Sequence, residues 1–209
     1  MESASRERVR TAPRSWPEFW LAYDAGEWEP ETKSILARFL GPGSLFVDVG
    51  AWIGPVTLWA VELGARVVAL EPDEAARVQL IENVTGLPVE VRPQALAATD
   101  GEGFLSNPWE LGDSRSRLSA SGVPVETISP ETLLDGIEPD LVKVDIEGGE
   151  IEVLPILAPL CRRRLIPLFV SWHEDWWQEG PSHATRRDWF AGCACEGEWG
   201  AFGSLLAIP

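Results

Sequence analysis

Short apolar runs alternate with longer stretches of helical length along most of this chain. The first run, LFVDVG at residues 45–50, is rich in the aliphatic residues that favour a buried strand. Alternation of this kind predicts parallel βαβ units and therefore an α/β fold. The predicted strands cover residues 45–50, 66–72, 89–92, 140–146 and 165–173, and the predicted helices between them cover 54–63, 73–84, 130–134 and 150–160.

The two ends of the chain extend this pattern. Phe19 and Trp20 follow Trp16 by three and four residues, which indicates one apolar helix face over residues 15–23. A second helix is expected from Pro30 to Leu40, because proline is favoured at the first helical position. Beyond the last parallel strand, we expect a helix over 183–190 and two closing strands near 193–199 and 203–208.

The middle of the chain is less regular. Residues 101–124 are rich in Gly, Ser and Asp, and we expect loops around short strands there, which could fold over a ligand. Within this segment, residues 112–117 carry hydroxyls and arginines that could recognise a polar molecule, although an ordinary loop is the simpler interpretation. The whole pattern predicts one sheet with helices on both faces.

The length of 209 residues suits one sizeable core. We expect residues 1–13 to form a disordered tail and residues 14–209 to form a single domain, with its N-terminal helices at 14–43. No long apolar run that could span a membrane is present, and the three cysteines lack the spacing of a zinc site. These features predict a cytoplasmic protein that does not bind membranes.

The net charge of −16 is strongly negative for a chain of this size. Such a charge repels a phosphate backbone, so nucleic acid is not expected as a partner. The arginine runs at 162–164 and 186–187 are expected to be solvated charges near helix ends, and His183 is expected to lie on the surface.

The first strand ends in D-V-G-A-W-I-G, residues 48–54, where an open parallel sheet binds ligands. The glycine spacing differs from the G-x-G-x-x-G of dinucleotide-binding turns, which disfavours a pyrophosphate. Glu71 ends the second strand, where its carboxylate can accept hydrogen bonds from both hydroxyls of a ribose. These features favour a cofactor with a free ribose and no pyrophosphate.

Three segments, FVDVGAWIGPVTLWA, VVALEPD and LVKVDIEGGEIEVL, resemble the FkbM family of methyltransferases, and the resemblance extends over residues 28–173. It implies a class I methyltransferase (Rossmann-like) fold, a three-layer sandwich with a mostly parallel seven-stranded sheet. The resemblance also implies S-adenosylmethionine as cofactor. The residues implied to bind it are Glu29, Asp48, Gly50, Ala51, Trp52, Gly54, Glu71, Pro72, Ala95, Leu96 and Asp145.

Two of these positions allow alternatives. Trp52 stands where the family usually has asparagine, and its ring could stack on the cofactor or wall it off. In the segment WEPET, Glu29 or Thr32 could face the methionine end of the cofactor, and Glu29 could instead serve as a helix cap.

The residues expected to act on the acceptor also lie at strand ends. Asp145 and Glu147 follow one predicted strand, and His173 ends the next. Methyl transfer to a hydroxyl needs a base, and His173, oriented by a carboxylate, is the preferred general base. The same three side chains could hold a divalent metal, which is possible but not expected. Lys143 is interpreted as structural: strand alternation is expected to turn it away from the neighbours of Asp145, although it could also reach a carboxylate.

The predicted function is S-adenosylmethionine-dependent O-methylation of a hydroxyl on a small molecule, sugar or natural product. One alternative is a catalytically silent module that binds the cofactor or a partner. Another is an NAD(P)-dependent oxidoreductase, which the glycine spacing disfavours. Trp172, Trp176 and Trp177, beside His173, could equally belong to the core or to an acceptor pocket. The acceptor's identity and the oligomeric state stay open.

Overall fold

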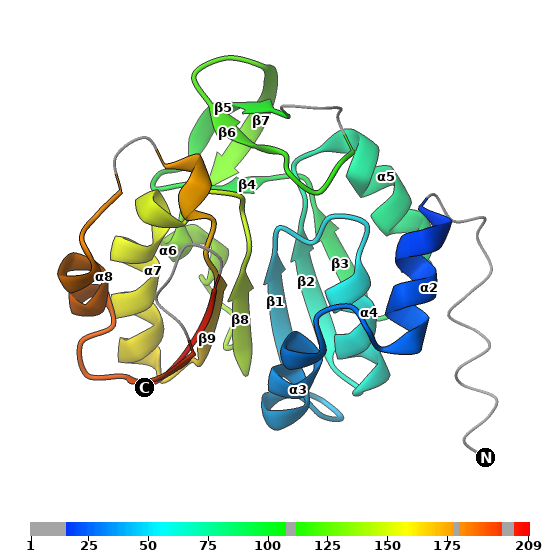
Figure 1. Ribbon diagram of the computed structural model, residues 1–209, viewed down its shortest axis with the longest axis horizontal. Coiled ribbons are helices and arrows are strands. Elements are labelled where there is room, and N and C mark those ends of the chain that lie inside the picture. Colours follow the sequence, from blue (N-terminus) through cyan, green and yellow to red (C-terminus); the bar gives the residue numbers. More distant parts are fainter. Residues whose placement is uncertain (1–15, 108–111, 178–179, 198–202) are drawn as a thin grey trace.

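The computed structural model describes residues 16–107, 112–177, 180–197 and 203–209. These residues form a seven-stranded sheet with helices on both faces (Figure 1). The strand order is β10-β11-β9-β8-β1-β2-β3, and β11 runs antiparallel to both of its neighbours while the other pairs are parallel. The strands are β1 Leu45–Val49, β2 Arg66–Leu70, β3 Val89–Arg92, β8 Leu141–Val144, β9 Leu168–Ser171, β10 Ala194–Gly197 and β11 Ser204–Ile208. The predicted three-layer α/β sandwich is therefore confirmed.

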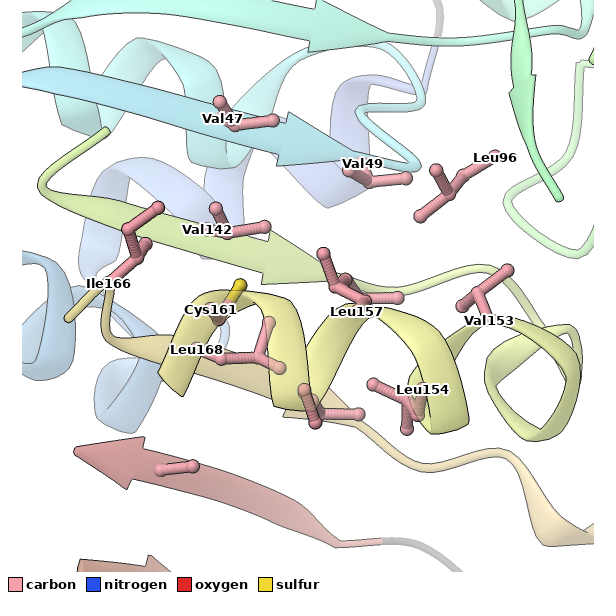
Figure 2. Packing of buried hydrophobic residues seen from close by; sticks show 14 of the residues in the cluster. Val47, Val49, Leu96, Val142, Val153, Leu154, Leu157, Cys161, Ile166 and Leu168 are labelled. Atoms are coloured by element: carbon pink, nitrogen blue, oxygen red, sulfur yellow. The ribbon is translucent and has the colours of Figure 1, made fainter. Parts of the chain in front are cut away.

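The central strands are apolar because helices cover both of their faces. On one face, Val47 and Val49 of β1 pack with Val142 of β8 and with Leu157 of the long helix α7 (Figure 2). On the other face, Phe46 belongs to a second buried cluster that includes residues of α2, α3, α4 and α5. Strand alternation thus divides the core into two layers, and it places Asp48 on the same face as Phe46.

Most helices begin where the sequence predicts. Proline occupies the first turn of α2, α3, α4 and α6, while the side chains of Asp73, Ser129 and Ser182 accept hydrogen bonds from the first turns of α5, α6 and α8. The helices are α2 Pro17–Ala25, α3 Pro30–Phe39, α4 Pro55–Glu62, α5 Glu74–Asn83, α6 Pro130–Leu133, α7 Glu150–Arg164, α8 His183–Trp189 and the 3₁₀ turn η2 Glu174–Trp176.

A second sheet lies above the main one (Figure 1). Its strand order is β4-β7-β5-β6, with bounds β4 Ala95–Leu96, β5 Gly101–Ser106, β6 Arg117–Ser119 and β7 Val123–Ile128. Short strands joined by loops occur at 101–124 as expected, but the expectation of a single sheet is wrong, because these strands pair in a sheet of their own. In β5 only Leu105 is buried, so the apolar alternation that predicts a strand is almost absent.

Three sequence-based expectations about the periphery have different outcomes. The predicted tail, residues 1–13, lies outside the described residues, so it stays a prediction together with the single-domain boundary. Arg186 is not a solvated charge as expected, because it is 2% exposed and donates a hydrogen bond to Glu174. His183 is exposed at the start of α8, as predicted. Within the described residues, no helix has both the length and the apolar character needed to cross a membrane.

Candidate active site

The glycine-rich loop after β1 brings the ends of β1 and β8 together. Gly50 has a φ of 80°, and a Cβ built there would lie 1.8 Å from the carbonyl oxygen of Asp145. A side chain is excluded both by this contact and by the left-handed backbone. Gly54, with a φ of 93°, would place a Cβ 2.6 Å from Leu80 of α5, so it serves helix packing.

Glu71 follows β2 and is held from both sides by backbone N–H groups. Its Oε2 accepts a hydrogen bond from the backbone of Trp52, and its Oε1 accepts one from the backbone of Asp73, both at 2.8 Å. Burial raises the pKa of Glu71 to about 7, and the two backbone hydrogen bonds oppose that rise. A carboxylate oxygen can accept more than one hydrogen bond, so both oxygens can still accept from a ribose.

A cavity lies over the ends of β1, β2 and β8. Its wall includes seven of the predicted cofactor-binding residues: Gly50, Trp52, Glu71, Pro72, Ala95, Leu96 and Asp145. A further part of the wall consists of Gln94 and several residues of the segment 112–118, which agrees with the alternative that residues 101–124 fold over a ligand. We call residues 112–118 the cap segment; Asp113, Ser114, Ser116, Arg117 and Leu118 of it line the cavity.

Asp48 does not reach this cavity wall. It is 0% exposed, and its Oδ2 accepts a hydrogen bond of 2.6 Å from the Thr57 hydroxyl at the start of α4. Burial raises the pKa of Asp48, while the charge of Lys143 lowers it. In the described structure this carboxylate anchors α4 against β1, which differs from the direct cofactor contact that the family resemblance implies.

Trp52 connects three parts of the site. Its indole Nε1 donates a hydrogen bond of 2.8 Å to the carbonyl of Gly112 in the cap segment. Its ring centroid lies 4.9 Å from that of Phe19 in α2, in an edge-to-face arrangement. Asp73 also holds the cap segment, since its Oδ2 accepts hydrogen bonds from the Gly112 backbone and the Ser116 hydroxyl. Trp52 could either stack on the cofactor or close off one side of its cavity, and these contacts favour the second role.

Asp145, Glu147 and His173 lie together, as predicted, at the ends of β8 and β9. The His173 Nε2 lies 3.5 Å from Asp145 Oδ1 and 3.6 Å from Glu147 Oε1. The orienting carboxylate, however, is Glu150, which the sequence interpretation missed. Its Oε1 lies 3.2 Å from His173 Nδ1, and its two oxygens accept hydrogen bonds from the backbone N–H groups of residues 146 and 148.

The carboxylates around His173 control its protonation. Burial lowers the pKa of His173, but the hydrogen bond with Glu150 and the charges of Asp145, Glu150 and Glu147 outweigh burial and raise it to about 9. Burial raises the pKa of Glu147. A general base must be unprotonated, and the neutral fraction of His173 falls as the pH decreases below about 9. The base role of His173 stays a prediction.

A second cavity adjoins the first and contains the charged side chains. Glu29, Lys143, Asp145, Glu147 and His173 line it, while Gly50, Trp52 and Asp145 belong to the walls of both cavities. The predicted cofactor-binding residue Ala51 lies in the second wall only.

The expectation that Lys143 faces away is wrong, whereas the alternative that its side chain reaches a carboxylate is confirmed. Residues two apart in a strand share a face, so Lys143 points to the same side as Asp145. Its Nζ donates a hydrogen bond of 2.7 Å to Asp145 Oδ2, and its side chain is 2% exposed. Burial lowers the pKa of Lys143, but the negative charges of Asp145, Asp48 and Glu29 outweigh burial and raise the pKa above its ordinary value. The charge of Lys143 in turn lowers the pKa of Asp145 against the effect of burial.

Glu29 occupies the position before α3, but its side chain does not cap the helix backbone. It accepts a hydrogen bond of 2.9 Å from the Thr32 hydroxyl, and burial raises its pKa. The backbone of Glu29 is left-handed, with a φ of 38°. Of the two interpretations, the structure therefore disfavours the cap and leaves the carboxylate in the wall of the second cavity.

The three tryptophans near His173 have different environments. Trp172 is 1% exposed and belongs to the core. Trp177 is partly buried and packs against that core. Trp176 donates a hydrogen bond of 2.9 Å to Glu147 Oε2, and the guanidinium of Arg117 lies 4.0 Å from its ring centroid. Trp176 thus links Glu147 to the cap segment.

Known proteins resemble this chain in sequence. The family model of the methyltransferase FkbM domain matches residues 48–196. Hexuronic acid methyltransferase AglP of Haloferax volcanii is 28% identical over 152 residues, which cover 70% of this chain and 63% of that protein. The chain therefore spans less than two thirds of the length of this relative.

Solved structures show the same fold. Methyltransferase FkbM from Methylobacillus flagellatus matches with a TM-score of 0.54 and 13% identity, over 90% of this chain and 60% of that one. A putative rRNA-methylase from Clostridium thermocellum matches with a TM-score of 0.54 and 10% identity, over 86% of this chain and 93% of that one. The class I methyltransferase fold is confirmed, and the match over residues 48–196 shows that the chain belongs to the FkbM family of methyltransferases.

Proposed function

We propose that this protein uses S-adenosylmethionine to methylate a hydroxyl oxygen of a sugar or a similar polar small molecule. The observation that carries this proposal is the pair of adjoining cavities. One presents the Glu71 carboxylate above a glycine loop, the other presents a charged cluster, and Asp145 belongs to both walls. A methyl donor in the first cavity would thus lie next to an acceptor in the second.

The residues of the first cavity fit this cofactor. Gly50 lets the loop pack directly against the backbone of Asp145 at the cavity edge, and Glu71 offers acceptors for the ribose hydroxyls. Ala95 and Leu96 supply a buried apolar surface suited to the adenine, and Glu29, in the wall of the adjoining cavity, would face the methionine end of the cofactor. When bound, the cofactor supplies an electrophilic methyl group on a sulfonium.

The second cavity suits a polar acceptor. Asp145, Glu147 and His173 can bind hydroxyl groups by hydrogen bonds, and a carboxylate or the unprotonated form of His173 can take up a proton from one of them. Lys143 holds Asp145 in place. The relative named for hexuronic acid supports a sugar as acceptor. The net charge of −16 supports a small molecule over a nucleic acid.

Isothermal titration calorimetry with S-adenosylmethionine tests the cofactor, and acceptor-dependent release of S-adenosylhomocysteine tests the reaction. We expect cofactor binding by the protein alone, and turnover only when a hydroxyl-bearing sugar is present. Cofactor binding without turnover on any sugar would leave the catalytically silent module as the better account. Binding of NADH in place of S-adenosylmethionine would favour the oxidoreductase.

A further inference from the structure

We propose that Asp145, Glu147 and His173 form a binding site for one divalent cation that accepts both oxygen and nitrogen ligands, such as Mn²⁺. One ligand atom from each side chain lies within 4.8 Å of the other two. The donors are two carboxylates and one imidazole, a set that suits this class of cation. The site goes beyond the proposed function, which needs no metal.

The spacing of the donor atoms is close to that of a coordination shell. His173 Nε2 lies 3.5 Å from Asp145 Oδ1 and 3.6 Å from Glu147 Oε1. Around an octahedral cation with ligands at about 2.1 Å, neighbouring ligand atoms lie about 3.0 Å apart. The two distances from His173 thus exceed the spacing of a coordination shell by only about 0.5 Å.

The outer atom of each proposed ligand is fixed by a residue outside the trio. Glu150 Oε1 lies 3.2 Å from His173 Nδ1, and its carboxylate would fix the tautomer that leaves Nε2 free to bind a metal. Lys143 donates a hydrogen bond to Asp145 Oδ2, and Trp176 donates one to Glu147 Oε2. Partners of this kind orient the ligands of known metal sites, and here all three ligands have one.

The surroundings also suit a cation with open coordination positions. The side chains of Asp145, Glu147 and His173 are 22%, 12% and 16% exposed, so an ion can reach them. All three line the second cavity, into which the remaining positions would face. The two ligand carboxylates and Glu150 offer three negative charges, beside the positive charge of Lys143 and, when it is protonated, that of His173.

The use of this cation rests on the proposed function, whereas its binding does not. A cation at this position would lower the pKa of an acceptor hydroxyl, and the proton would pass to water. The electron pair of that oxygen would form the new O–C bond while the S–C bond breaks and its electrons stay on sulfur. The cation would also orient a second, neighbouring hydroxyl of a sugar.

Titration of the metal-free protein with Mn²⁺ alone tests the site, with free Mn²⁺ measured by electron paramagnetic resonance. We expect one Mn²⁺ per chain, and affinity more than about ten-fold weaker in Glu147→Gln and in His173→Gln. His183→Gln, on the exposed start of α8, is the matched control and should bind Mn²⁺ as the unchanged protein does. Circular dichroism establishes that each variant is folded. If only one of the two ligand variants folds, that variant alone is enough to test the site.

The outcomes separate the cation site from the proposed function. Absence of Mn²⁺ binding, or equal binding by both ligand variants and the control, would overturn the site. Mn²⁺ binding with the expected loss in the variants supports the site even when no sugar is methylated. Methylation that continues undiminished in EDTA, in a protein that does not bind Mn²⁺, would uphold the proposed function and refute the cation.

Discussion

Replacing Glu71 by glutamine tests the cofactor site through both its charge and its hydrogen bonds. A carboxylate that accepts a ribose hydroxyl contributes about 1.5–3 kcal/mol, which corresponds to about a 10- to 150-fold change in Kd. The variant keeps the shape of the side chain but replaces one acceptor oxygen by a donor. It therefore also disturbs one of the hydrogen bonds from Trp52 and Asp73.

The pH dependence distinguishes these two effects. Burial raises the pKa of Glu71 to about 7, so the carboxylate that binds the ribose is the minor form below that pH. If only the ionised form binds, the affinity for S-adenosylmethionine rises about ten-fold between pH 6 and pH 8. In Glu71→Gln the affinity should be weaker and should no longer change over this interval.

Isothermal titration calorimetry at three pH values measures both quantities, and urea unfolding establishes whether the variant is folded. Glu90→Gln is a suitable control, because Glu90 is exposed and forms its ion pair with Arg92 at the sheet edge. A wild-type affinity that does not depend on pH, together with an unchanged affinity in Glu71→Gln, would remove Glu71 from the cofactor site.

Three further changes test other parts of the structure. Gly50→Ala should destabilise the fold by more than Gly86→Ala in urea unfolding, since both glycines have similar positive φ but only Gly50 has atoms within 4 Å of an added Cβ. Lys143→Met should cost about 3–5 kcal/mol at neutral pH, because it leaves Asp145 without its buried partner. Asp145 has a lowered pKa, so this loss should shrink as the pH falls through that pKa, which unfolding at several pH values measures. Trp52→Phe keeps an aromatic ring at this position and removes one hydrogen bond to the cap segment. Amide hydrogen exchange in the cap segment should therefore become about five-fold faster, which corresponds to about 1 kcal/mol. Equal protection in both proteins would show that this bond does not hold the cap segment.

The main sheet could be predicted from the sequence because its strands are buried on both faces. Residues 46–49 and 141–144 are all buried, and apart from Asp48 and Lys143 these strands are apolar runs between helices. The second sheet could not be predicted in the same way. Its strands expose most of their side chains, and their pairing depends on contacts between residues distant in sequence, such as Gly101 with Thr127.

The candidate site could be predicted where it depends on strand ends. Parallel strands end at one edge, which is why Asp145 and His173 were expected to meet and do. Lys143 was misplaced by an error about strand alternation, since residues two apart share a face. Glu150 could have been identified as a charged residue in the first turn of a helix beside the site. Its contact with His173 depends on tertiary packing, which the sequence pattern does not contain.

The position of the transferred methyl group tests the central claim most directly. The protein would be incubated with S-adenosylmethionine carrying a labelled methyl group and with a panel of neutral sugars and hexuronic acids. The product would then be analysed by mass spectrometry and NMR before and after mild alkali. We predict a methyl ether on a hydroxyl oxygen, which alkali does not remove. A methyl ester on a carboxylate, released by alkali, would contradict a hydroxyl acceptor, and a label that never leaves the cofactor would contradict methyl transfer to these sugars.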